Sequence, residues 1–325
     1  MVIGSFMPLR SVWDEKLEKL SRDFPEHRVL KGLAPDSPEI PSLDIMLTVN
    51  LPVEAFERAK ALKAIFQPLT GINHLPLGLL ADRGVHVFNN HANAFDVAER
   101  ALALALAFYG RIVEYHNDLA ACRWHGLWVK GGAEDRWESL YGKTCSILGT
   151  GAIGQALASL LKPFGGRILG WRRKTGLPVP MGFDAVLPSL DQALEEAEIV
   201  FVALPGTEET KGLLSRERLA RMKGKLLVNV GRGSIVDEEG LYIALKEGIL
   251  RGAAIDTWYQ YPKEGKIGSP SRFPIHELPN VLLSPHVGGS THQASSRSVD
   301  STMEKLEDYL KTGSCAGEAD LRAAY

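Results

Sequence analysis

Two side chains in the second half of the chain have the chemistry of an acid–base and anion-binding site. His286 follows an apolar run that begins at Val281, and Arg232 lies in a glycine-flanked turn after another apolar run. An imidazole with an ordinary pKa of about 6.5 exchanges protons near neutrality. A guanidinium group clamps a carboxylate and polarises a carbonyl. Either residue alone is more often structural, so their placement decides whether they act together.

A glycine-rich run, Gly149–Gly154, supplies the context for those two side chains. It follows the apolar run Cys145–Leu148 and opens a helical pattern, and a second apolar run, Arg167–Trp171, completes a strand–turn–helix–strand unit. In such a unit the glycines permit a tight turn, a close approach of the backbone to a pyrophosphate, and close packing of the helix on the strand. The helix N-terminus adds free N–H groups for the phosphates. The pattern therefore predicts a dinucleotide site rather than a structural turn.

The residues after the second strand of this unit bear on which dinucleotide binds. NAD sites usually carry Asp or Glu at this place, where the carboxylate binds the ribose hydroxyls. Here Arg172 and Arg173 follow the strand, and guanidinium groups bind a 2′-phosphate that a carboxylate would repel. NADP(H) is therefore favoured, with NAD(H) as the alternative. A solvated basic loop is the other interpretation of this run.

Strand and helix patterns alternate along the chain and predict a two-domain α/β protein. The longest helical pattern, Ala94–Tyr115, is apolar around much of its circumference, which predicts a buried helix. The segment Asn117–Tyr141 has little periodicity and contains three tryptophans. A dimerisation arm, an active-site cover and an anchored surface loop all remain open for it.

Composition narrows the class of protein. The 325 residues are 45% hydrophobic and 23% charged with a net charge of −2, which is typical of a soluble globular protein and gives no reason to expect nucleic-acid or membrane binding. The three cysteines have no metal-ligand spacing, so they are expected to be reduced thiols. The start of the chain lacks the features of a signal peptide, and no apolar run approaches the ~20 residues of a membrane span. We therefore expect a soluble cytoplasmic protein without a metal.

The ordered motifs from Gly142 to Gly289 resemble the D-isomer-specific 2-hydroxyacid dehydrogenase family, which includes glyoxylate and hydroxypyruvate reductases and formate dehydrogenases. The motifs are GTGAIG, LPGTEETKGLLS, VNVGRGSIVDEE, GAAIDTW and PNVLLSPHVGG, with looser matches at LTGINHL and NAFDVAE. The resemblance implies a Rossmann-type doubly wound parallel sheet domain for dinucleotide binding, residues 93–289. It also implies a smaller flavodoxin-like α/β domain for substrate binding, residues 1–92 and 290–325. A homodimer is implied as well.

The resemblance also implies an activity and residue roles. A hydride would pass from NAD(P)H to a small 2-keto acid such as glyoxylate, hydroxypyruvate or pyruvate, giving a D-2-hydroxy acid. Arg232 would bind the substrate carboxylate and keto oxygen, and His286 would donate the proton. The N–H groups of Thr70 and Gly71 would hold the carboxylate, and Asn93 would orient it. The implied cofactor contacts, beside Arg172 and Arg173, are Gly149, Gly151, Ala152, Ile153, Gly154, Leu204, Pro205, Thr210, Val230, Gly231, Asp256 and Gly288.

One residue departs from the family pattern. Tyr261 occupies the place of the Glu that usually hydrogen-bonds the catalytic His, and a neutral Tyr does not raise the pKa of an imidazole as a carboxylate does. One hypothesis is keto-acid reduction favoured at lower pH, with Tyr261 orienting the ring or the nearby Glu264 replacing the acid. The alternatives are formate oxidation, which needs no proton transfer, and a nucleotide-sensing binding protein. Retention of Arg232 and His286 argues against a purely binding role, and keto-acid reduction is favoured over formate oxidation.

Overall fold

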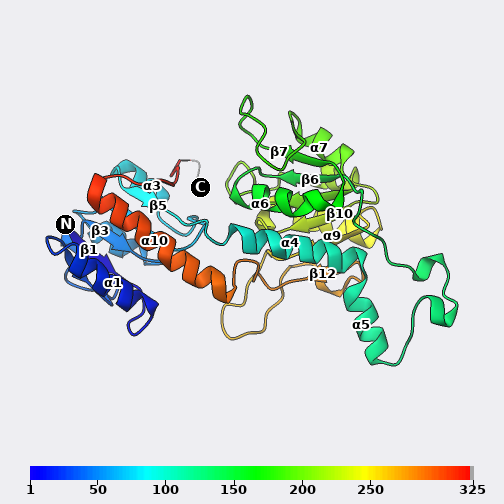
Figure 1. Cartoon of the computed structure of the whole chain (residues 1–325), viewed down its shortest axis with the longest axis horizontal. Coiled ribbons are helices and arrows are strands. Elements are labelled where there is room, and N and C mark those ends of the chain that lie inside the picture. The colour runs from blue at the N-terminus through cyan, green and yellow to red at the C-terminus, as the bar shows by residue number, and fades with distance from the viewer. Residues whose placement is uncertain (323–325) are drawn as a thin grey trace. The chain divides into compact units, whose positions relative to one another are not determined.

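The computed structural model describes residues 1–322, and this part of the chain divides into two compact units. One unit consists of Met1–Asn93 with the segment from Ser290, and the other consists of Ala94–Gly289. Each unit contains one parallel sheet covered by helices, so the predicted α/β fold class with two parallel sheets is confirmed (Figure 1).

The unit that holds the N-terminus is built on a five-stranded sheet in the order β2-β1-β3-β4-β5, which is the flavodoxin-like order. Its helix α10 packs against α1 on one face of the sheet, over a core that includes Phe66 and Phe88. A second core, which includes Phe56 and Ile72, lies on the other face. The strands and helices are β1 (Val2–Ser5), α1 (Val12–Asp23), β2 (Arg28–Leu30), a 3₁₀ helix (Ile40–Ser42), β3 (Ile45–Leu47), α2 (Val53–Arg58), β4 (Ala64–Phe66), α3 (Leu77–Asp82), β5 (His86–Phe88) and α10 (His292–Thr312).

The other unit is built on a seven-stranded sheet in the order β12-β11-β10-β9-β6-β7-β8. From β6 the strand order proceeds first toward β8 on one side and then from β9 toward β12 on the other. Rossmann-type sheets bind ligands at this switch point between β6 and β9. Its regular elements are α4 (Ala94–Tyr109), α5 (Ile112–Ala120), β6 (Cys145–Leu148), α6 (Ala152–Leu161), β7 (Ile168–Trp171), β8 (Ala185–Leu187), α7 (Leu190–Glu196), β9 (Ile199–Val202), α8 (Arg216–Ala220), β10 (Leu226–Asn229), α9 (Glu238–Lys246), β11 (Gly252–Ile255) and β12 (Val281–Leu283).

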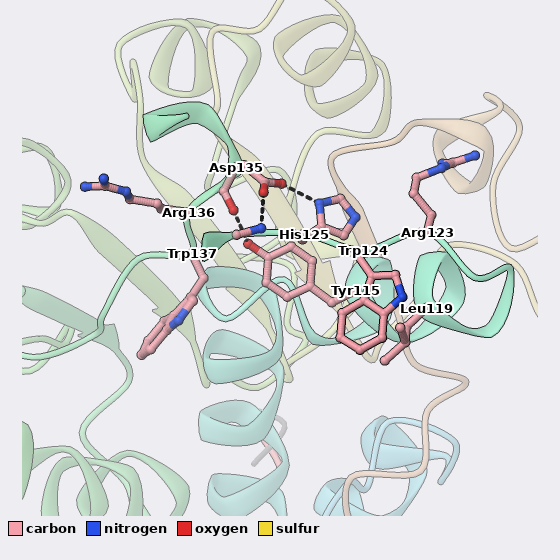
Figure 2. Close-up of a pocket in the computed structure, with 9 residues that line it drawn as sticks. Tyr115, Leu119, Arg123, Trp124, His125, Asp135, Arg136 and Trp137 are labelled. Atoms are coloured by element: carbon pink, nitrogen blue, oxygen red, sulfur yellow. Dashed lines mark hydrogen bonds and ion pairs between the residues drawn. The ribbon is translucent and has the colours of Figure 1, made fainter. Parts of the chain in front are cut away.

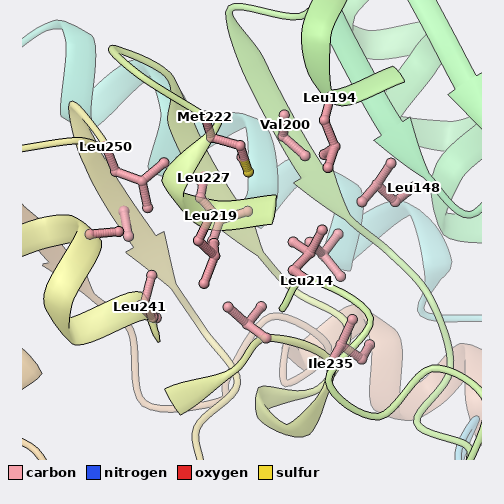
Figure 3. Close-up of a cluster of buried hydrophobic side chains, with 14 of the residues drawn as sticks. Leu148, Leu194, Val200, Leu214, Leu219, Met222, Leu227, Ile235, Leu241 and Leu250 are labelled. Carbon is pink, nitrogen blue, oxygen red and sulfur yellow. The ribbon is translucent and has the colours of Figure 1, made fainter. Parts of the chain in front are cut away.

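The central strands of this sheet explain the continuous apolar runs in the sequence. Every residue of β6, β9, β10 and β11 is buried, because helices cover both faces of the sheet. Figure 3 shows one of these faces, where Val200 and Leu227 of the strands meet Leu219 and Leu241 of the covering helices. The strands are thereby held in fixed register, and their carboxyl ends form a stable edge.

The prediction of one helix over Ala94–Tyr115 is wrong. The helix α4 ends at Tyr109, and α5 begins at Ile112. Gly110 weakens a helix by roughly 1 kcal/mol relative to Ala, and Arg111 after it adopts a left-handed backbone conformation with φ of 50°. The apolar pattern therefore belongs to α4, which packs against α6 and buries residues such as Ala101 and Leu104.

Residues 112–141, comprising α5 and the segment after it, form an arm that extends away from the sheet of its unit (Figure 1). The imidazole of His125 organises the arm, because its Nε2 lies 2.8 Å from a carboxylate oxygen of Asp118 and its Nδ1 contacts Asp135. Asp135 and Asp118, in that order, raise the pKa of His125 and favour the charged clamp. Figure 2 shows the pocket of about 510 Å³ beside it, lined by Tyr115, Leu119, Arg123, Trp124, His125, Gly126, Asp135, Arg136 and Trp137.

Candidate active site

The polar residues predicted to do chemistry in the second unit lie at the carboxyl ends of neighbouring strands. The glycine loop follows β6, Leu204 and Pro205 follow β9, Arg232 follows β10, Asp256 follows β11 and His286 follows β12. These five strands are consecutive in the sheet. The loops also pack closely, since a Cβ on Gly149 would lie 2.6 Å from the carbonyl oxygen of Ala203, after β9. The sheet therefore gathers these residues along one edge.

The glycine loop fits a pyrophosphate. Gly149 has φ of +105°, which favours glycine, and a Cβ on Gly154 would lie 2.0 Å from the carbonyl oxygen of Gly149. A Cβ on Gly151, in contrast, would meet no described atom within 4 Å. Gly151 is the N-cap of α6, so the N–H groups of the first turn, at Ala152 and Ile153, face this open space without a side-chain cap. Gly149 and Gly154 thus determine the shape of the loop, and Gly151 leaves space for a phosphate beside the N-terminus of α6.

Arg172 lies beside this loop. Its Nη1 is 3.4 Å from the hydroxyl of Thr150, and its Nη2 donates to the carbonyl oxygens of Leu177 at 2.5 Å and Pro178 at 2.8 Å. Its Nε is buried and has no partner among the described residues. Arg173 instead pairs with Glu209. Arg172 is therefore held as part of the wall next to the glycine loop.

Arg232 is half-buried at the end of β10 and forms no ion pair with any described carboxylate. Its turn is held by Asn229, whose side-chain amide donates to the carbonyl oxygen of Arg232 at 3.0 Å and accepts from the N–H of Gly231 at 3.1 Å. Loss of hydration lowers the pKa of Arg232, although a guanidinium stays charged at neutral pH. The result is a positioned cation without a bound anion partner.

The buried carboxylate of Asp256 holds the turn that carries His286. It accepts hydrogen bonds from the hydroxyl of Ser284, from the N–H of Val287 at 3.1 Å and from the N–H of Gly288 at 3.0 Å. His286 lies between these donors and has a left-handed backbone conformation, with φ of 57°. The turn presents the imidazole outward, and the side chain is exposed within its unit.

The electrostatic surroundings of His286 make it a poor proton carrier at neutral pH in the free protein. Partial desolvation lowers its pKa and the charge of Arg232 lowers it further, while Asp256 opposes the shift. Tyr261 supplies no charge, because desolvation raises the pKa of its phenol. Glu264 forms no ion pair or hydrogen bond with His286 in the described part of the chain, so the suggestion that it replaces the family's acid gains no support.

The predicted carboxylate-binding turn lies in the first unit. The hydroxyl of Thr70 donates to the side-chain oxygen of Asn93 at 3.1 Å. Asn89 donates to the carbonyl oxygen of Thr70 at 2.7 Å, and Gln67 donates to that of Gly71 at 2.8 Å. The backbone carbonyl oxygens of both turn residues thus accept hydrogen bonds from buried side chains of the same unit. The backbone N–H groups of Thr70 and Gly71 have no acceptor among the described residues.

Comparison with known proteins decides the family. The model of the NAD-binding domain of D-isomer-specific 2-hydroxyacid dehydrogenases matches residues 102–288. The chain is 32% identical over 312 residues to a glyoxylate reductase of Korarchaeum cryptofilum, which covers 91% of this chain and 90% of the relative. The chain belongs to the D-isomer-specific 2-hydroxyacid dehydrogenase family.

Two further comparisons agree with this assignment. The dehydrogenase is 30% identical over 297 residues to a hydroxypyruvate reductase of Thermotoga maritima, with 90% of each chain covered. A solved structure of a Pyrococcus horikoshii protein has a TM-score of 0.81 at 27% identity, with 98% of this chain and 95% of that chain covered. The predicted family and the predicted class, a nicotinamide-dependent oxidoreductase of 2-keto and 2-hydroxy acids, are therefore confirmed.

Neither a membrane helix nor a metal cluster occurs in the described part of the dehydrogenase. None of its helices within residues 1–322 combines the length and apolarity that crossing a bilayer requires. No group of His, Cys, Asp and Glu within the same residues is arranged to hold a metal ion.

The sequence did not reveal the supporting role of the polar side chains that hold the turns of the site. Asn229 and Ser284 are buried polar residues at the ends of apolar strands. A polar residue directly after an apolar run is the feature of the sequence that could have indicated this role. Gln67 and Asn89 carry the same signal in the first unit.

The glycine loop yields a prediction that separates folding from cofactor binding. The Gly154→Ala variant is expected to lose about 1–3 kcal/mol of stability, because its methyl group overlaps the carbonyl of Gly149. The Gly151→Ala variant is expected to keep its thermal midpoint but to bind the nicotinamide cofactor at least tenfold more weakly, since its methyl group occupies the open space beside the N-terminus of α6. Calorimetry and fluorescence titration measure the two effects. Equal nucleotide affinity in wild type and Gly151→Ala would contradict this account.

Proposed function

We propose that this dehydrogenase reduces a small 2-keto acid, glyoxylate or hydroxypyruvate, with NADPH as the preferred hydride donor. Relatives named for these two substrates match about nine tenths of the chain. The observation that carries the proposal is the pairing of Arg232, a half-buried cation without a carboxylate partner, with His286 on the turn after β12. Such a pair suits a substrate that has both a carboxylate and a carbonyl to protonate.

The roles follow from the chemistry of the two side chains. Arg232 binds the substrate carboxylate and polarises the keto oxygen, and the nicotinamide, when bound, supplies the hydride. As negative charge develops on the keto oxygen, the imidazolium of His286 donates a proton to it and becomes neutral imidazole. In the oxidative direction the neutral imidazole accepts the hydroxyl proton.

The remaining assignments belong to the same proposal. Residues 94–289 form the dinucleotide-binding domain, and the other unit forms the substrate-binding domain, in which Thr70, Gly71 and Asn93 bind the substrate carboxylate. Gly149, Gly151, Ala152, Ile153 and Gly154 support the pyrophosphate. The other proposed cofactor contacts are Arg172, Arg173, Leu204, Pro205, Thr210, Val230, Gly231, Asp256 and Gly288. Asp256 already accepts three hydrogen bonds, so it combines this role with holding the His286 turn.

The proton donor makes the reductive rate depend on pH. Since the pKa of His286 lies below its ordinary value, the imidazolium is scarce at neutral pH and kcat/KM for keto-acid reduction rises as pH falls. His286→Asn is expected to reduce that rate at least 100-fold. NADPH oxidation with glyoxylate and hydroxypyruvate between pH 5 and 9 tests both statements. Absence of keto-acid turnover, together with formate-dependent reduction of the oxidised cofactor, would overturn the proposed function.

Arg172 is proposed to bind the 2′-phosphate of NADPH, because it lies beside Thr150 where a carboxylate would select NAD(H). Arg172→Ala is expected to lower kcat/KM for NADPH roughly 10- to 100-fold, the value of one charge-assisted interaction, and to leave NADH little affected. The control Lys174→Ala removes the same charge from an exposed side chain two positions away. Equal losses in both variants would mean that only overall charge matters.

We also propose that the arm forms part of a homodimer interface. Six apolar side chains of the arm are exposed, those of Leu119, Trp124, Leu127, Trp128, Val129 and Trp137, and exposed apolar patches are typical of interaction surfaces. Two of these side chains, Leu127 and Trp128, are 86% and 85% exposed.

The dimer proposal is tested by sedimentation velocity of the wild type and two variants. Trp128→Asp is expected to shift the protein from dimer to monomer, because it places a charge in the apolar contact. Met181→Asp changes a side chain that is 88% exposed outside the arm and serves as the matched control. A monomeric wild type, or a dimer that survives Trp128→Asp, would exclude this interface.

A further inference from the structure

We infer that Tyr261 is a positioning residue for His286, held in place by Trp258 and acting on the imidazole through ring contact instead of a carboxylate. The inference rests on the proposed function, because it concerns how the proton donor of that reaction is oriented. It is carried by three contacts that link the loop after β11 to the turn after β12.

The first two contacts fix the two segments relative to each other. The backbone N–H of Trp258 donates to the phenol oxygen of Tyr261 at 3.1 Å. The indole N–H of the same Trp258 donates to the carbonyl oxygen of Ser284 at 2.8 Å. Trp258 is buried in the core, so packing restricts the orientation of its ring. One residue therefore holds both Tyr261 and the start of the His286 turn.

The third contact joins the two rings. The centroids of Tyr261 and His286 are 5.4 Å apart and their planes are inclined by 45°, which is within the range of aromatic pair contacts. The phenol oxygen faces Trp258, and no hydrogen bond joins it to the imidazole in the described part of the chain. Tyr261 thus limits the rotation of the imidazole by packing, and it adds no negative charge to it.

The other charged groups around His286 do not replace that charge. Arg232, from the turn after β10, acts against protonation, and Asp256, at the end of β11, acts in favour of it. The carboxylate of Asp256 is already shared among the three donors of the His286 turn. An acid placed at position 261 would therefore supply the negative charge that His286 lacks. Its effect is expected in the pH profile of the enzyme.

The experiment compares Tyr261→Phe, Tyr261→Gln and Tyr261→Glu with the wild type in the full-length enzyme. Tyr261→Phe keeps the ring and is expected to retain kcat within about threefold and an unchanged pH profile. Tyr261→Gln removes the ring and is expected to lower kcat about tenfold without moving the profile. Tyr261→Glu is expected to move the midpoint of kcat/KM for reduction upward by about one to two pH units, as a neighbouring carboxylate does.

A second measurement keeps the inference testable apart from turnover. The pH titration of the His286 ring, followed by NMR against a His286→Asn reference spectrum, is expected to move upward in Tyr261→Glu and to stay unchanged in Tyr261→Gln. A wild type that reduces no keto acid would defeat the proposed function alone, since the titration of Tyr261→Glu still reports whether position 261 lies beside the imidazole of His286. An unmoved titration in Tyr261→Glu, or wild-type kcat in Tyr261→Gln, would overturn the positioning role.

Discussion

The position of His286 depends on one buried carboxylate. Asp256 accepts hydrogen bonds from the side chain of Ser284 and from two successive backbone N–H groups, at Val287 and Gly288. Hydrogen bonds to a charged group contribute about 1.5–3 kcal/mol each, and the left-handed conformation of a residue other than glycine costs about 1–2 kcal/mol. The carboxylate therefore easily holds His286 in its unfavourable backbone conformation. Without it the imidazole would lose its fixed place at the end of β12.

The same kind of support is found at two other turns of the candidate site. Asn229 holds the turn of Arg232, and Asn89 with Gln67 holds the turn of Thr70 and Gly71. In each case a buried polar side chain binds backbone groups on the protein side, and the functional side chain or N–H group is directed away from it. Since a buried polar group without a partner costs about 1–3 kcal/mol, each support is stable only in the conformation that also presents the site. Folding and site geometry are thereby linked.

The sequence predicted those features of the fold and the site that come from periodic patterns, and it did not predict those that come from the folding of irregular segments. Apolar runs located the strands and their carboxyl ends, because burial on both faces leaves a continuous signal, and the glycine spacing located the tight loop before α6. The end of α4 was missed although Gly110 marked it, since the apolar pattern continued past the break. The ring contact of Tyr261 and the clamp of His125 between Asp118 and Asp135 depend on how irregular segments fold, and no periodic pattern encodes such contacts.

Tyr261 in place of an acid changes how the enzyme is supplied with protons. Desolvation and the charge of Arg232 both disfavour imidazolium in the free protein. A substrate carboxylate that binds Arg232 neutralises the second of these effects, so a bound keto acid itself increases the proton affinity of His286. A permanent carboxylate at position 261 would keep the imidazole charged with or without substrate. With the aromatic ring, protonation would be coupled to binding. We therefore expect kcat/KM, which reports the free enzyme, and kcat, which reports the complex, to have separate acid limits.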